Sequence, residues 1–126
     1  MMQISFEPLV DDSFDDERCR VAIDTGRFRG EARYRNQSPS DFEELLIAVR
    51  QYPISKPLNG EWFDGLFKLQ IEPIDRRGIL RLQATVTEEI DSNSVSIDVG
   101  ITYEALQRFA RELAALIDKS VGTATL

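Results

Sequence analysis

The chain has 126 residues and a formal net charge of −7, with 42% hydrophobic and 29% charged residues. These values are typical of one soluble globular domain that is large enough to bury its own core. Histidine is absent and Cys19 is the single cysteine, which excludes histidine-dependent catalysis, His-ligated zinc and a disulfide within the chain.

The N-terminal residues 1–17 differ in charge from the rest of the chain. They contain six acidic and no basic residues and carry −6, whereas residues 18–126 carry −1. They lack the cationic and apolar regions of a signal peptide, and the longest apolar run, 45–49, is too short to span a membrane. We therefore expect a single cytoplasmic domain over 1–126 that begins with an acidic segment.

Five of these acids gather in the stretch VDDSFDDE at 10–17. They are Asp11, Asp12, Asp15, Asp16 and Glu17. A calcium loop that began at the first of them would need glycine at its sixth position and glutamate at its twelfth, but the chain has aspartate and alanine there. The spacing argues against calcium, and leaves either a solvated loop or a binding surface for a basic partner.

Alternation of apolar and polar residues over 18–35 predicts a β-hairpin. A two-residue turn at 25–26 would place Ile23 opposite Phe28 on the apolar face. Cys19 shares this face, which favours a core thiol over a nucleophile.

The other face of the predicted hairpin is rich in arginine. Six arginines occur in this stretch, against Asp24 and Glu31. The predicted register pairs Asp24 with Arg27 and Glu31 with Arg20, and the acidic balance of the whole chain opposes nucleic-acid binding. We interpret this face as a solvated sheet surface.

Residues 38–52 carry the signals of a helix. Ser40 and Glu43 form a capping box, and Pro53 ends the segment. Apolar residues recur at helical spacing, at Phe42, Leu45, Leu46 and Val49.

The stretch 53–65 is rich in turn-forming residues and contains the only tryptophan. Trp62 and Phe63 would anchor a protein partner if they were exposed. The alternative is an aromatic lid over one end of the core. The sequence leaves both interpretations open.

Residues 67–86 predict a second hairpin, in which Ile74 lies opposite Ile79 and Glu72 opposite Arg81. A further strand follows over 94–101, with its valines and isoleucines on one face.

Thr102 then caps a helix that runs to about Lys119. The apolar stripe of this helix consists of Leu106, Phe109, Ala110, Leu113, Leu116 and Ile117. We expect residues 120–126 to be frayed.

No catalytic motif stands out. Glu88, Glu89 and Asp91 cluster in a charged turn, where no burial would raise the pKa of one carboxyl for acid–base work. Neither a dinucleotide-binding fingerprint nor a P-loop occurs. We expect no enzymatic activity, no catalytic residues, no metal and no cofactor.

The predicted order of elements is β-ββ-α-βββ-α, with residues 3–7 as an extra first strand. This order predicts an α+β fold with one antiparallel sheet of five to six strands and two helices on one face of the sheet.

Several segments carry a family resemblance. They are DDE at 15–17, FKLQIEPID at 67–75, GILRLQATV at 78–86 and SVSIDVGITYEAL at 94–106. Over roughly residues 15–118 the chain resembles the small bacterial immunity proteins of the WapI type. The resemblance implies that the protein shields a cell from a contact-delivered toxin. Because the shared motifs are structural, it implies no particular site residue.

We therefore expect a non-enzymatic protein-binding module, an immunity protein that neutralises a bacterial toxin by occluding a basic surface. The expected contact residues are the acids at 11–17 together with Trp62 and Phe63. The alternatives are a small-ligand-binding domain with a pocket between helices and sheet, and a subunit of a homodimer. The sequence leaves open whether the acids bind a partner or pair with the arginines of 18–35.

Overall fold

The computed structural model describes residues 2–7, 18–27, 29–35, 40–50, 57–74, 78–88, 93–119 and 122–126. These residues form eight strands and two helices. In chain order they are β1 Met2–Glu7, β2 Arg18–Asp24, β3 Arg29–Arg35, α1 Ser40–Val49, β4 Leu58–Trp62, β5 Phe67–Pro73, β6 Ile79–Thr87, β7 Ser94–Thr102, α2 Tyr103–Lys119 and β8 Gly122–Thr125.

The strands form two antiparallel sheets of four strands each. We call the sheet with the order β3-β2-β1-β8 sheet A and the sheet with the order β4-β5-β6-β7 sheet B. The α+β class is confirmed, whereas the single sheet of five to six strands is replaced by two sheets. The difference arises because β4 and β8 were not expected and because β1, β2 and β3 do not pair with β4–β7.

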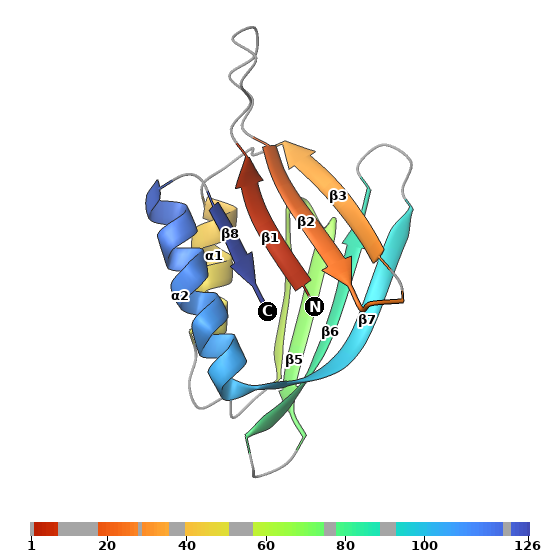
Figure 1. The fold of residues 1–126 in the computed structure, drawn as a ribbon, viewed down its shortest axis with the longest axis vertical. Coiled ribbons are helices and arrows are strands. Elements are labelled where there is room, and N and C mark those ends of the chain that lie inside the picture. Colours follow the sequence, from red (N-terminus) through yellow and green to blue (C-terminus); the bar gives the residue numbers. More distant parts are fainter. Residues whose placement is uncertain are drawn as a thin grey trace, which may run out of the picture.

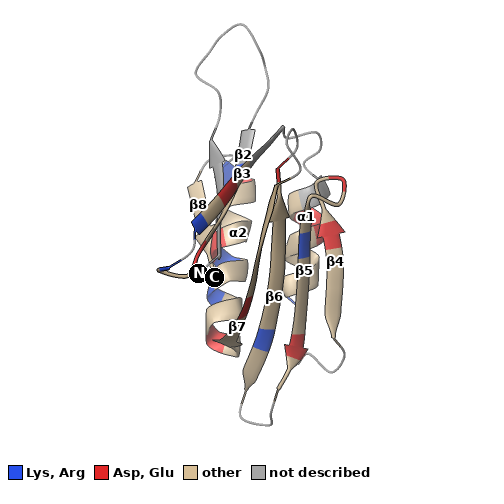
Figure 2. Ribbon diagram, turned by 90° about the vertical axis from the view of Figure 1, so that its right-hand side faces the viewer, with Lys and Arg blue, Asp and Glu red and all other residues tan. Residues whose placement is uncertain are grey.

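The two sheets lie face to face, and both helices lie along one side of them (Figure 1). Seen from the side, the sheets are separate layers with the helices between them (Figure 2). On the opposite side, β2 and β3 contact β6 and β7 directly. The arrangement is a wedge, in which the sheets touch along one side and the helices hold them apart along the other.

The first hairpin is paired two residues away from the predicted register. Ile23 lies opposite Gly30, and the ladder ends at the pair of Asp24 and Arg29; Phe28, the predicted partner of Ile23, lies outside the described residues. A shift of two residues keeps every side chain on its predicted face, so the apolar pattern cannot detect it. The ladder ends early because Oδ1 of Asp24 accepts a hydrogen bond of 2.8 Å from the Gly26 amide, and Gly26 has a φ of 88°.

The second hairpin has the predicted register. Ile71 lies opposite Leu82 and Glu72 opposite Arg81. The Ile74 amide donates a 3.0 Å hydrogen bond to the Ile79 carbonyl, as the expected pairing of these two residues requires.

Both helices occur where the sequence predicts them. α1 covers Ser40–Val49 within the expected 38–52, and Phe42, Leu45 and Val49 of its predicted stripe are buried. At the start of α2 the Ala105 amide donates a 3.1 Å hydrogen bond to Oγ1 of Thr102, which confirms the predicted N-cap.

The expectation of a frayed tail over residues 120–126 is wrong for 122–126. β8 pairs with β1, with Ala124 opposite Ile4, and Ala124 and Leu126 are buried. The tail is held because it supplies the outer strand of sheet A beside α2, which local sequence signals do not indicate.

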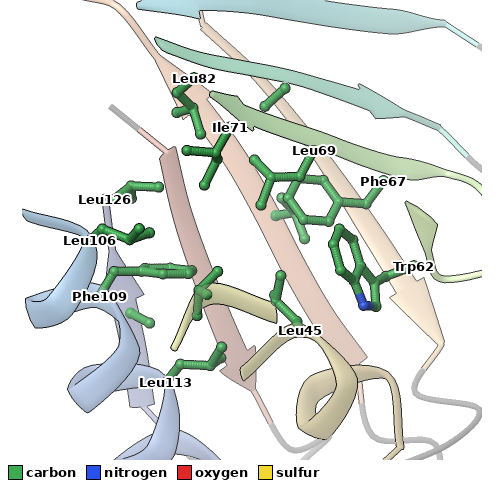
Figure 3. Close-up of a cluster of buried hydrophobic side chains, with 14 of the residues drawn as sticks. Leu45, Trp62, Phe67, Leu69, Ile71, Leu82, Leu106, Phe109, Leu113 and Leu126 are labelled. Atoms are coloured by element: carbon green, nitrogen blue, oxygen red, sulfur yellow. The ribbon is translucent and has the colours of Figure 1, made fainter. Parts of the chain in front are cut away.

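The core fills the wedge between the sheets and the helices. Figure 3 shows side chains of α1, α2 and sheet B converging on one cluster, with Leu126 at its margin. The largest fully buried side chains are Phe67, Phe109, Ile23, Leu45, Leu69, Ile71, Leu80, Leu82 and Leu106. Every layer contributes to this set, so the two sheets and two helices share one core.

The close side of the wedge depends on a glycine. A Cβ atom placed on Gly30 of β3 would lie 2.5 Å from Cγ1 of Val95 on β7. Real Cβ atoms do not approach a carbon so closely, so only glycine lets the edges of the two sheets meet at this point.

We predict that Gly30→Ala destabilises the protein by about 1–3 kcal/mol, because the added methyl overpacks against Val95. The free energy of unfolding in urea measures this loss. In Gly30→Ala/Val95→Ala the second truncation removes the closest contact, to Cγ1 at 2.5 Å, and leaves only that to Cβ of residue 95 at 2.9 Å, so the two costs should be less than additive. Strictly additive costs would show that the contact does not limit the approach of the sheets.

Candidate functional site

Both ends of the acidic segment are connected to the same end of sheet A. Asp11, Asp12, Asp15, Asp16 and Glu17 lie outside the described residues, so their predicted roles stay predictions. The segment joins Glu7 of β1 to Arg18 of β2, and these two residues are directly opposite each other in the sheet. The segment is therefore attached where the arginine-rich strands β2 and β3 begin and end.

Arginines occupy facing positions in that part of sheet A. Arg18 lies opposite Arg35 and Arg20 opposite Arg33 in the ladder. Like charges in opposed positions repel each other. Glu31 lies 3.8 Å from the guanidinium groups of both Arg20 and Arg29. One carboxylate thus serves two arginines, and β2 and β3 retain an excess of positive charge.

Trp62 and Phe63 do not form an exposed anchor. Each is only 5% exposed, and the ring centroids of Trp62 and Phe67 are 5.9 Å apart (Figure 3). Phe63 packs edge-on against Phe42 of α1, with centroids 5.6 Å apart. The described structure therefore corresponds to the aromatic lid. A partner could reach these rings only if the core opened.

The turn that carries Phe63 has an unusual backbone. Phe63 and Asp64 have φ angles of 56° and 57°, in the left-handed region that non-glycine residues seldom occupy. Burial of the Phe63 ring against α1 holds this conformation in place. The strained turn lets Phe63 pack against α1. Because the strain has this structural cause, it is weak evidence for a binding site.

The outer face of sheet B is internally paired. Nε and Nη2 of Arg81 donate to the two carboxylate oxygens of Asp98 at 2.9 and 2.6 Å, and Glu72 lies 3.6 Å from Nη1 of the same arginine. Oγ of Ser96 lies 2.8 Å from Oγ1 of Thr85. Figure 2 shows basic and acidic residues interspersed over this sheet, so it offers no field of one sign.

Strand β7 lies at an edge of sheet B, and no described strand pairs with its outer side. The Glu88 amide donates to the Asn93 carbonyl and the Tyr103 amide to the Gly78 carbonyl, and both bonds belong to the register of β6 with β7. Because hydrogen-bonded pairs alternate in an antiparallel ladder, the N–H and C=O groups of Ser96, Asp98 and Gly100 face away from β6.

The inward-facing side chains of β7 are incompletely covered. The buried residues of β6 are at most 2% exposed, whereas Val95, Val99 and Ile101 of β7 are only partly buried. An additional strand along this edge would gain hydrogen bonds. It would be stabilised further by covering the remaining apolar surface of these side chains.

A cavity of about 230 Å³ lies between the helices. Val49 and Arg50 line it from the C-terminal end of α1. α2 contributes residues that share one face of the helix, namely Tyr103, Leu106, Gln107, Ala110 and Arg111. No residue of a strand lines this cavity, so it is not the expected pocket between helices and sheet, which stays a prediction.

Within the described residues, no group of three or more histidine, cysteine, aspartate or glutamate side chains could hold a metal ion. None of the described helices is both long enough and apolar enough to cross a membrane. No protein-family model matches the chain, and no curated protein matches it.

We predict that Asp98 contributes stability that is lost in acid. Its hydrogen bonds to Arg81 lower the pKa of its carboxyl below the ordinary 3.8. The contribution is therefore complete above pH 3.8 and disappears as the pH falls through the lowered pKa. The difference in thermal unfolding temperature between the wild type and Asp98→Asn should shrink over that range.

The matched control is Asp118→Asn, which removes an exposed acid of α2 outside this network. At neutral pH it should lower the unfolding temperature less than Asp98→Asn does. A carboxyl carbon titration of Asp98 by NMR with an ordinary midpoint would contradict the prediction.

Proposed function

We propose that the protein is a non-enzymatic binding module that takes up an extended segment of a partner protein along β7. The free edge of β7 is the observation that carries this proposal. β7 is nine residues long and offers outward-facing backbone groups at Ser96, Asp98 and Gly100. Only a chain in the extended conformation can satisfy such a row of donors and acceptors, so the occupant is a strand.

Three other strands also stand at sheet edges, and each is less suitable. β3 has charged residues at alternate positions, which natural edge strands use to prevent association. β4 and β8 have five and four residues, too few for a long ladder. β7 contains no proline, lysine or arginine, and its one acid is occupied by Arg81. The contrast favours β7 as the docking strand.

The resemblance to WapI-type immunity proteins supports a toxin domain as the partner. A toxin that cleaves nucleic acid or binds it needs a basic surface, and the acids at 11–17 would attract such a surface over a distance. We propose that these acids accelerate encounter and that β7 supplies the specific contact. Neutralisation of the toxin would follow from occlusion and requires no catalysis.

We predict that Gly100→Pro weakens the partner complex by about tenfold or more, since it removes one edge donor and places a ring in the path of the added strand. Gly100→Ala keeps the amide and is the matched control. A Cβ atom at this position has neighbours no closer than 3.9 Å, so the methyl fits. A photoreactive residue at position 96 captures the partner, and calorimetry then compares the dissociation constants.

Two results would contradict this prediction. Equal affinity of the proline and alanine variants for the captured partner would show that the edge is not used. Light scattering that finds a dimer of this chain, lost in Gly100→Pro, would show that a second copy fills the edge instead.

We predict that replacing Asp11, Asp12, Asp15 and Asp16 by asparagine slows association with the captured partner by about tenfold at low salt. The salt dependence of the rate should weaken, while the dissociation rate changes little. Stopped-flow kinetics at several salt concentrations measure both rates.

A control with the same change in net charge replaces exposed acids of the helices by their amides, at Glu43, Glu44, Glu104 and Asp118. Its association rate should fall much less. If the acids at 11–17 instead pair with arginines of β2 and β3, the four-asparagine variant will lose stability and keep its association rate.

A small-ligand function is the second candidate, and the cavity between α1 and α2 favours it. Stabilisation by a small molecule, with no protein captured at β7, would support this candidate over the first.

A further inference from the structure

The cavity between α1 and α2 combines an apolar floor with a basic mouth. Val49, Leu106 and Ala110 are 3%, 1% and 6% exposed and form the floor. Arg50, which follows α1, and Arg111 of α2 are exposed and line the mouth. A site of this kind suits a ligand that has an apolar body and a polar head.

The charge of the lining opposes the charge of the chain. The whole chain has 22 acidic and 15 basic residues, yet the lining contains two arginines and no acid. Within the described part of the chain, neither of these arginines forms an ion pair or a side-chain hydrogen bond. Their donors are therefore available to an anion.

The helix dipoles change the positive charge balance of the cavity lining only slightly. Arg50 directly follows the C-terminal end of α1, which is electrically negative, while Tyr103 is the first residue of α2, whose end is positive. Both ends contribute to the same cavity, so their effects largely offset each other. The guanidinium groups then decide the sign of the potential.

The other groups in the lining limit the ligand further. Tyr103 and Gln107 add a phenol and an amide beside the two arginines. The volume of about 230 Å³ is below the roughly 300–1,000 Å³ of pockets for drug-sized ligands. A single ring or a short aliphatic chain is therefore the largest body that the floor accommodates well. A planar carboxylate matches the fork of donors that a guanidinium presents.

We infer that this cavity binds a small organic carboxylate with a single-ring or short-chain body. The body lies on the floor of Val49, Leu106 and Ala110, and the carboxylate accepts hydrogen bonds from Arg50 and Arg111. The site is distinct from the strand-binding edge, because most of β7 lies on the side of the molecule away from the helices, although its C-terminal end leads directly into α2 (Figure 1).

The test uses the full chain labelled with ¹⁵N and titrated with sodium benzoate, sodium hexanoate and uncharged benzamide. Benzoate and hexanoate should shift the amide resonances of residues 103–111 in a saturable way. Benzamide has nearly the shape of benzoate but no charge, and it should bind about tenfold more weakly.

Variants of the mouth provide the second arm of the test. Arg50→Gln and Arg111→Gln should each weaken benzoate binding by about tenfold, and both side chains are exposed, so the variants should fold. Arg108→Gln is the matched control, because Arg108 is an exposed arginine of α2 that does not line the cavity. It should change the dissociation constant less than about twofold.

Three outcomes would overturn the inference. They are unsaturable shifts with every carboxylate, equal binding of benzoate and benzamide, and unchanged benzoate binding in both mouth variants. Unsaturable shifts would overturn it even if an acidic partner protein perturbed the same amides, because the proposed ligand is a free carboxylate. The benzoate titration needs no protein partner, and partner capture at position 96 needs no benzoate, so this inference and the strand-binding proposal can fail independently.

Discussion

The meeting of the two sheets at Gly30 and Val95 is the contact on which the rest of the fold depends. Sheets with ordinary side chains pack about 10 Å apart, and the missing side chain of Gly30 lets β3 approach β7 much more closely. The opposite margins of the sheets are held apart by α1 and α2. One close side and one open side give the molecule its wedge shape and decide where apolar surface remains.

The wedge distributes the candidate binding features to opposite sides. At the narrow side sheet A does not fully cover β7, so Val95, Val99 and Ile101 stay partly exposed. The outer backbone groups of β7 have no ladder partner among the described strands. At the broad side two helices fill the gap. Their contact is imperfect where α1 ends at Val49 and α2 continues, and the cavity forms there. Both features follow from the geometry of packing.

In this protein the positions of the charges matter more than the net charge. The outer face of sheet B balances its charges within the sheet, through Arg81 with Asp98 and Glu72. β2 and β3 hold two opposed pairs of arginines, Glu31 pairs with Arg20 and Arg29, and the most acidic segment of the chain is attached at the end of these strands. Under the proposed function, a partner with a basic surface would compete with the arginines of β2 and β3 for the acids at 11–17. The proposed steering of a toxin domain would act through that competition.

Much of the fold could be predicted from the amino-acid sequence, because its signals are local. The register of β5 with β6, the Thr102 cap and the core stripe of α2 follow from alternation, turn chemistry and helical spacing within short windows. The faces of β2 and β3 were also predictable, although their register was not, since a shift of two residues preserves the alternation. The charge asymmetry and the lack of histidine chemistry needed no structure.

Only the tertiary structure decided how these elements combine. β4 contains Asn59 and Gly60, which read as a turn, and it becomes a strand because β5 offers it a ladder partner. β8 is ordered for the same reason by β1. The burial of Trp62 and Phe63, the free edge of β7 and the cavity at Arg50 and Arg111 each depend on residues that are distant in the sequence. Local preferences determine which elements form, whereas contacts between distant segments determine which surfaces remain open, because no short window contains both sides of such a contact.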